Sequence, residues 1–212
     1  MDTIHFVRHG QSYANAGGVT QPNAEIELTE LGHGQARLVA SMLPIETPVI
    51  LTSEFIRTKQ TAQYLATKAN IEAQCEPLLN EFSTLCHTTI EGLNGAQRKP
   101  IIDKYWEESD PNHVAGLTAE SFIQFASRVE KFRLNRLNEL PHQSVVFGHG
   151  MWFAMLAWQT LGFDFNDSAS MRAFRRYQIE SPMPNCFSYQ FKRLSSGEWL
   201  IKTNIEPTSM ML

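Results

Sequence analysis

The chain has 212 residues, a length that favours one domain or one domain with a modest insertion. With 42% hydrophobic and 19% charged residues, its composition is that of a globular protein that buries a sizeable core. The formal net charge of -4 argues against binding to nucleic acid or a membrane surface, because both recruit basic proteins. No apolar run approaches the roughly 18 to 20 residues of a membrane span. We therefore expect a single domain over residues 1–212.

Cysteine usage and the N-terminus indicate the compartment. The three cysteines, Cys75, Cys86 and Cys186, are odd in number and show no C-x-x-C spacing. This pattern favours reduced, buried thiols over a disulfide framework or a thiolate zinc site. Residues 1–7 lack the basic segment and long apolar stretch of a secretory signal. A cytoplasmic protein is the expectation.

Short apolar runs alternate with longer helical patterns in the first part of the chain. The expected elements are a strand at residues 3–7, a helix from the N-cap Thr29 to about Met42, a strand at residues 49–52, a helix capped by Ser53, and a short strand within residues 73–79. The pattern then weakens over about 82–117, where glycine and proline recur. We interpret residues 82–117 as an insertion with short helices that acts as a lid or specificity element.

The second part of the chain resumes the alternation and ends differently. Its expected elements are a long helix capped by Thr118, a strand at residues 144–147, a helix at residues 151–161, and a hairpin of strands at residues 186–191 and 199–203. Alternating strands and helices are typical of an α/β fold with a mainly parallel sheet.

Two predicted strands end in similar turns, Arg8-His9-Gly10 and Gly148-His149-Gly150. In open parallel sheets, ligands bind beyond the carboxyl ends of the strands, so the two histidines are expected to face one pocket. Arg57 lies one turn into the helix after the second strand, where a helix N-terminus also favours anions. Each residue alone is more often structural. Together they predict an anion-binding site.

Five ordered blocks of residues cover nearly the whole chain, from Arg8 to about Tyr189. They are Arg8-His9-Gly10-Gln11-Ser12 with Asn15; Leu28-Thr29-Glu30-Leu31-Gly32 with Gln35 and Ala36; Ser53, Arg57, Gln60, Thr61 and Ala62; Leu79-Asn80-Glu81; and Gly148-His149-Gly150, with Asn185 before the last strands. In this order the blocks resemble the histidine phosphatase superfamily, which also contains the cofactor-dependent phosphoglycerate mutases. The resemblance implies a three-layer α/β/α sandwich of the phosphoglycerate mutase type.

The resemblance also implies a phosphohistidine mechanism that needs no metal and no cofactor. His9 would attack phosphorus, while Arg8, Arg57 and His149 surround the phosphoryl oxygens. Neutral imidazole is nucleophilic near pH 7, and the planar fork of arginine binds two oxygens at once. Glu81 would protonate the leaving oxygen and then activate water.

The remaining site residues lie on loops. The phosphate-binding set is expected to include a backbone N–H and loop side chains, namely Gly10, Ser12, Asn15 and Gly150. The Leu79-x-Glu81 pattern selects Glu81 as the acid, although Glu54 and Glu91 are rivals by position. The sequence has no Asp-rich or His-x-His metal signature, and the other five histidines are expected to be surface or core residues.

Departures from the mutases favour a phosphatase. Gln11 stands where mutases usually carry glutamate, and residues 82–87 replace their Arg-His-Tyr-Gly-Gly run. The arginines that grip a phosphoglycerate carboxylate have no clear counterpart, although Arg98 and Lys99 are available for another anion. The expected activity is therefore that of a phosphomonoesterase of the histidine acid phosphatase type, acting on a small phosphorylated metabolite.

Other functions remain open. A mutase-type phosphotransferase is one alternative, and a catalytically weak module that binds a phosphorylated partner is another. A structural α/β protein with incidental histidines does not explain five ordered blocks. The absence of G-x-G-x-x-G and G-x-x-x-x-G-K argues against dehydrogenases and nucleotide-loop enzymes. The sequence leaves the oligomeric state open, a homodimer included.

Overall fold

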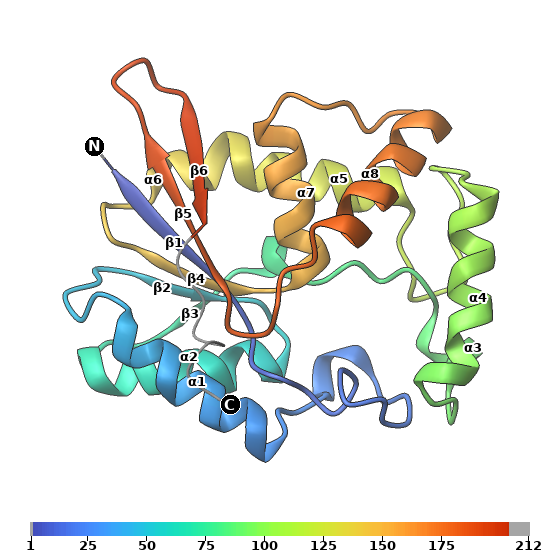
Figure 1. Cartoon of the computed structure of the whole chain (residues 1–212), viewed down its shortest axis with the longest axis horizontal. Coiled ribbons are helices and arrows are strands. Elements are labelled where there is room, and N and C mark those ends of the chain that lie inside the picture. Colours follow the sequence, from blue (N-terminus) through green and yellow to red (C-terminus); the bar gives the residue numbers. More distant parts are fainter. Residues whose placement is uncertain (1, 204–212) are drawn as a thin grey trace.

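The computed structural model describes residues 2–203, and a six-stranded sheet runs through this part of the chain (Figure 1). The strand order is β3-β2-β4-β1-β5-β6. The strands are β1 (Thr3–Arg8), β2 (Ile50–Thr52), β3 (Gln74–Cys75), β4 (Val145–Gly148), β5 (Ser188–Arg193) and β6 (Trp199–Thr203). The first four are parallel to one another, and β5 and β6 form an antiparallel hairpin beside β1. The predicted mainly parallel sheet and terminal hairpin are confirmed.

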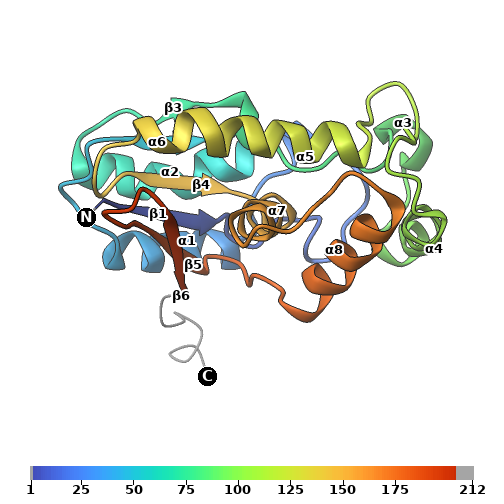
Figure 2. The same cartoon turned by 90° about the horizontal axis from the view of Figure 1, so that it is seen from above.

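Helices cover both faces of the sheet (Figure 2). They are α1 (Glu30–Met42), α2 (Ile56–Ala69), α3 (His87–Ile90), α4 (Gly95–Glu108), α5 (Phe122–Lys131), α6 (Leu137–Glu139), α7 (Gly150–Thr160) and α8 (Ser168–Glu180). A π-helical turn at Phe132–Arg136 joins α5 to α6, and single 3-10 turns lie at Asn23–Glu25 and Pro77–Leu79. None of the helices within residues 2–203 has both the length and the apolarity to cross a membrane.

The alternation of side chains along β1 shows how the three layers form. Successive residues of a strand point to opposite faces of the sheet. Ile4 and Phe6 lie in one buried cluster with residues of α5 and α7, whereas Val7 lies in a second cluster with residues of α1 and α2. Each face of the sheet is therefore buried under its own helices, which confirms the predicted α/β/α sandwich.

The pairing of β1 with β4 brings the two histidine motifs side by side. Arg8 is opposite Gly148 in the parallel register, and the His9 N–H donates to the Gly148 carbonyl at 3.0 Å. The two strands thus end at the same level. His9 and His149 emerge together at the carboxyl edge of the sheet, where the sequence pattern places a ligand site.

A close approach between two glycines joins the loop after β1 to the first turn of α1. A Cβ atom at Gly10 would lie 2.4 Å from the Gly32 carbonyl oxygen, and one at Gly32 would lie 2.0 Å from the Gln11 oxygen. Both distances are far below any van der Waals contact, so this packing requires glycine on both sides. The contact anchors the loop that carries His9.

Residues 82–117 lie beyond the carboxyl ends of the parallel strands (Figure 1). They contain α3, a short helix as the sequence predicts, and α4, which with 14 residues is longer than predicted. Tyr105 and Trp106 of α4 are buried in the larger core cluster, and the Arg175 guanidinium of α8 lies 4.8 Å from the Trp106 ring centroid. The base of the insertion is therefore packed against the core.

Several local predictions were wrong. The cap of α5 is Ser121, which forms a capping box with Gln124, and not Thr118, whose hydroxyl donates to Cys86 Sγ. The N-cap of α2 is Phe55 and not Ser53. The predicted strand at 73–79 is a two-residue strand followed by a 3-10 turn. Helix α8 was not predicted, and the free Cys75 is exposed rather than buried.

Candidate active site

His9 is buried, and its two ring nitrogens have different partners. Nδ1 lies 2.7 Å from the Gly10 carbonyl oxygen, which only accepts hydrogen bonds, so Nδ1 carries the proton. The Arg57 Nε–H donates to Nε2 at 3.2 Å, so Nε2 carries a lone pair. Burial, followed by the charges of Arg57 and Arg8, holds the His9 pKa well below its usual value of 6.5. The imidazole is therefore neutral, with its nucleophilic nitrogen facing the Arg57 guanidinium.

Arg57 is the second residue of α2, and its guanidinium is held over His9 by a loop. Nη1 donates to the Asn23 carbonyl at 2.6 Å and Nη2 donates to Asn23 Oδ1 at 3.1 Å. The guanidinium carbon also lies 4.8 Å from the Phe55 ring centroid. Burial lowers the Arg57 pKa to about 10, so the side chain remains charged near neutrality. No ion pair with a carboxylate neutralises this charge among residues 2–203.

Arg8 ends β1 and places a second guanidinium in the same site. Its Nη1 donates to the Met183 carbonyl, while its buried Nε has no hydrogen-bond partner within residues 2–203. A Cβ at Gly150 would lie 3.3 Å from this Nε. Gly150 therefore leaves room for the guanidinium at the start of α7.

His149 is fully buried, and its ring centroid lies 5.2 Å from that of His9. Its Nε2 shares a 2.8 Å hydrogen bond with Ser53 Oγ, which also contacts Thr58 Oγ1 at 2.9 Å. Burial, followed by the charge of Arg57, holds the His149 pKa well below 6.5. Ser53, which the sequence predicts as the cap of α2, thus orients His149 instead.

Two polar atoms of the site are buried without a partner among the described residues, Arg8 Nε and His149 Nδ1. Buried polar groups in folded proteins are nearly always hydrogen-bonded, so an unsatisfied pair at one site calls for a ligand. Arg8 offers only a donor, and His149 becomes a donor at Nδ1 when protonated. A bound oxyanion would satisfy both atoms.

Glu81 lies at the N-terminus of α7. Its Oε1 accepts from the Trp152 N–H at 3.0 Å and the Phe82 N–H at 2.9 Å, and its Oε2 accepts from the Met151 N–H at 3.1 Å. Burial raises the Glu81 pKa above 4.5, although these amides and the two arginines oppose the shift. The protonated form is thereby made more accessible, as a proton donor requires.

The two rival carboxylates lie elsewhere. Glu54 is exposed and accepts from Asn80 Nδ2 at 2.6 Å, and Glu91 is exposed at the end of α3. Neither contributes to the cavity that Glu81 lines. The geometry therefore supports Glu81 over both.

The loop after β1 is tied together by its own side chains. Asn15 Oδ1 accepts from Ser12 Oγ at 3.1 Å and from Asn185 Nδ2 at 3.2 Å, and Asn185 also donates to the His9 carbonyl at 2.9 Å. These bonds fix the Asn15 amide with its NH₂ group as the remaining donor. The Gly10 N–H, expected to serve phosphate, donates to Thr61 Oγ1 at 3.1 Å. The Gly10 N–H is therefore not free to donate to a phosphate, and Gly10 instead allows the close packing against Gly32.

Comparison with known proteins decides the family. The family model of the histidine phosphatase superfamily (branch 1) matches residues 4–178. The chain belongs to the histidine phosphatase superfamily. A probable phosphoglycerate mutase of Photorhabdus laumondii, GpmB, is 28% identical over 208 residues, which cover 94% of this chain and 91% of GpmB. The family predicted from the five blocks is confirmed.

Solved structures of phosphatases share the fold. A mycobacterial glucosyl-3-phosphoglycerate phosphatase is 24% identical, with a TM-score of 0.71 over 96% of this chain and 98% of its own. A phosphoserine phosphatase from Entamoeba histolytica is 20% identical, with a TM-score of 0.75 over 98% of each chain. At these identities the likeness concerns the fold of the superfamily.

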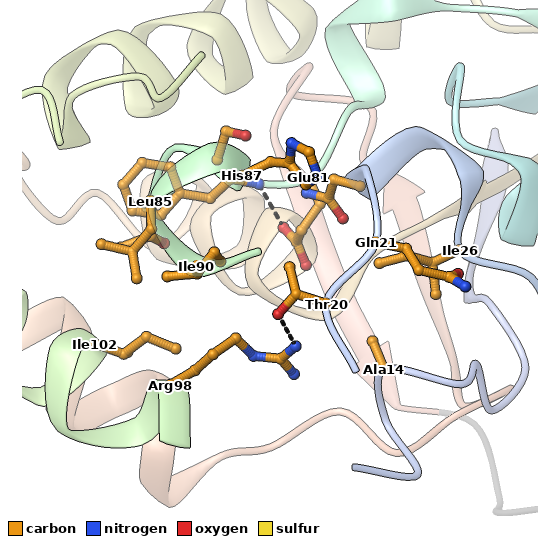
Figure 3. Close-up of a pocket in the computed structure, with 14 residues that line it drawn as sticks. Ala14, Thr20, Gln21, Ile26, Glu81, Leu85, His87, Ile90, Arg98 and Ile102 are labelled. Carbon is orange, nitrogen blue, oxygen red and sulfur yellow. Dashed lines mark hydrogen bonds between the residues drawn. The ribbon is translucent and has the colours of Figure 1, made fainter. Parts of the chain in front are cut away.

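A cavity of about 260 Å³ adjoins the site of this superfamily member (Figure 3). It lies between the loop after β1 and the insertion, with Glu81 in its wall. Its lining residues fall into three groups: Ala14, Thr20, Gln21, Asn23 and Ile26; Glu81, Phe82, Ser83, Thr84 and Leu85; and His87, Ile90, Arg98 and Ile102. Residues of the insertion therefore line the same space as Glu81.

The sequence did not reveal the residues that support the site. Arg128 of α5 donates to the carbonyls of Leu78 at 2.9 Å and Asn80 at 2.7 Å, and it pairs with Glu120 at 2.6 Å. These contacts hold the segment that carries Glu81. Asn23, which holds Arg57, was also missed, because an asparagine in a polar loop carries no signal of its partner.

Proposed function

We propose that this chain is a phosphatase that hydrolyses phosphomonoesters of small metabolites through a phosphohistidine at His9, without a metal ion. The observation that carries the proposal is the His9 lone pair on Nε2, placed beside the buried Arg57, the half-buried Arg8 and the unpaired His149 Nδ1. Preorganised donors of this kind stabilise the charge that spreads over the phosphoryl oxygens. Two guanidinium groups without carboxylate partners supply the positive charge that a metal ion provides in other phosphatases.

Hydrolysis proceeds in two steps. His9 Nε2 attacks phosphorus, the bond from phosphorus to the ester oxygen breaks, and Glu81 gives its proton to that oxygen as the alcohol leaves. Water then attacks the phosphohistidine, the Glu81 carboxylate takes one proton from it, and the bond from nitrogen to phosphorus breaks to release phosphate. The raised pKa of Glu81 suits the first step, and its regeneration as an acid closes the cycle.

A phosphotransferase of the mutase type is the second candidate, because GpmB carries that name. The wall after Glu81 argues for hydrolysis, since Phe82 and Leu85 present apolar side chains to the cavity. Single-turnover labelling separates the two activities. A mutase passes the label to an acceptor such as a glycerate, whereas a phosphatase loses it to water.

The decisive experiment combines a labelled aryl phosphate with a His9→Ala variant. We expect an acid-labile phosphoryl label in wild type, and a loss of kcat on the order of 10⁴-fold in His9→Ala, by analogy with the removal of other nucleophiles. His113→Ala, at an exposed position of the insertion, serves as the control and should keep full activity. Full activity in His9→Ala, or activity that is abolished by a chelator and restored by zinc or magnesium, would contradict the proposal.

A further inference from the structure

We infer that the cavity beside Glu81 binds the leaving group, and that it selects a compact apolar framework bearing a carboxylate, which Arg98 recognises. This inference rests on the proposed function, because it takes Glu81 as the donor to the leaving oxygen. The substrate class is thus a phosphomonoester with an aromatic or branched aliphatic core and one further negative charge.

The apolar part of the inference rests on the walls of the cavity. Five aliphatic or aromatic side chains from three separate segments line it, namely Ile26, Phe82, Leu85, Ile90 and Ile102. Figure 3 shows Leu85, Ile90 and Ile102 together on the insertion side, opposite Ala14 and Ile26. Polar side chains also line the cavity, among them Gln21, Ser83 and His87. The hydroxyl groups of a polyol that face the five apolar side chains would nevertheless lose their hydration. An apolar core gains from the same contact.

The charged part rests on Arg98, the one Lys or Arg that lines this cavity. Its Nη1 donates to Thr20 Oγ1 at 2.6 Å and is 3.4 Å from the Leu93 carbonyl, both of which are neutral acceptors. Within residues 2–203 it forms no ion pair, whereas its neighbour Lys99 pairs with Asp103. The half-buried guanidinium therefore lacks a counterion. A ligand carboxylate would provide one with matching planar geometry.

The position of Glu81 links both parts to the reaction. The ester oxygen must lie beside Glu81 to receive a proton, so the organic group attached to it extends into the cavity that Arg98 also lines (Figure 3). The volume of about 260 Å³ is below the roughly 300–1,000 Å³ of pockets for drug-sized ligands, so the framework must be small. One guanidinium matches one negative charge, which favours a carboxylate over a second phosphate dianion.

The test compares 4-carboxyphenyl phosphate with its neutral isostere, 4-carbamoylphenyl phosphate. In wild type we expect a kcat/KM that is about 10- to 100-fold higher for the carboxylate, the range for a hydrogen bond to a charged group. Arg98→Gln should abolish this preference through KM and leave kcat nearly unchanged. Lys104→Gln, at an exposed position of the same helix, is the matched control and should retain it.

A binding measurement keeps the inference testable apart from turnover. Calorimetry with 4-carboxybenzylphosphonate and benzylphosphonate should show the same preference in wild type and its loss in Arg98→Gln. Equal affinities in wild type, or a preference that survives Arg98→Gln, would overturn the role of Arg98. A lower KM for 3-phosphoglycerate than for 4-carboxyphenyl phosphate would overturn the apolar framework. If any of these results is obtained while labelled phenyl phosphate still transfers its phosphoryl group to His9, the proposed function stands and only this inference fails.

Discussion

The floor of the site, made of Arg8, His9, Arg57 and His149, differs in construction from the wall formed by residues 82–117. The floor residues follow directly from strands or begin a helix, and the register of β1 with β4 sets their spacing. The wall is built from the short helix α3, the longer helix α4 and loops, and its Leu117 is fully exposed. Phe82, Tyr105 and Trp106 pack its base into the larger core cluster. Thr20 of the loop opposite contacts it through the Leu93 carbonyl and through Arg98.

On the proposed function, this difference separates the residues that react from those that select the substrate. In the floor His9, Arg57 and His149 are buried, and the pairing of β1 with β4 fixes the strand ends. On the proposed function, a change there alters the reacting atoms and not only the fit of the substrate. The wall can vary in sequence without disturbing the sheet, as loops on a rigid scaffold commonly do. Substitutions in the floor should therefore act on kcat, and those in the wall should act on KM.

Glu81 gives the sharpest test, because it is bonded to α7 beside the floor and also lines the cavity. Glu81→Gln should lower kcat by about 10²- to 10⁴-fold for a poor leaving group, the usual contribution of a general acid. In wild type, kcat/KM should fall as the pH rises through the raised pKa of Glu81, and this alkaline limb should vanish in Glu81→Gln.

The control for this variant is Glu54→Gln, which removes an exposed carboxylate outside the cavity. Its pH profile and kcat should match those of wild type. An unchanged alkaline limb in Glu81→Gln would show that another group donates the proton.

A smaller effect is expected from adding a methyl group at the contact between Gly10 and Gly32, which anchors the loop that carries His9. Gly32→Ala should destabilise the fold by about 2 kcal/mol or more, because the added methyl would lie 2.0 Å from a backbone oxygen. Gly34→Ala lies two residues further along the same helix, with nothing within 4 Å of the added atom. It should raise stability by up to about 1 kcal/mol, since alanine favours helix over glycine. Urea unfolding measures the free energy of unfolding of both variants. Equal values for Gly32→Ala and Gly34→Ala would contradict this prediction.

The smallest effect concerns acid stability. His149 has a folded pKa well below 6.5, so below pH 6.5 the unfolded chain binds a proton that the folded chain does not. Its contribution therefore lowers the free energy of unfolding as the pH falls from 7 to 5.5, by about 1 kcal/mol for one histidine. His149→Gln should flatten this pH dependence by that amount. Parallel unfolding curves for His149→Gln and wild type would refute the assignment.

Most of the floor could be predicted from the sequence because its residues lie in short contiguous motifs at strand ends. Arg8-His9-Gly10 and Gly148-His149-Gly150 each mark a strand end, and parallel pairing then brings them together. Arg57 followed from the position of α2. The fold class followed from the alternation of apolar runs and helical patterns.

The supporting contacts could not be predicted, because they join residues distant in sequence through ordinary polar side chains. Ser53 fits the preferences of a helix cap, yet its hydroxyl orients His149, which lies 96 positions away. Helix α8 was missed because its core-facing residues, Met171 and Phe174, are few among polar neighbours. The pattern of residues along the sequence predicts helices and strands, whereas contacts between residues distant in sequence depend on tertiary packing.

The hold of Asn23 on Arg57 has a consequence for turnover. Asn23 offers two oxygens to the Arg57 fork, in the manner of a phosphate, so the buried guanidinium is solvated by protein while the site is empty. If a phosphoryl group is to bind this fork, it must exchange with those oxygens, and the net gain is the difference between two similar sets of bonds. On the proposed function, we expect Asn23 to compete with inorganic phosphate for this guanidinium. Such competition would weaken product inhibition by phosphate.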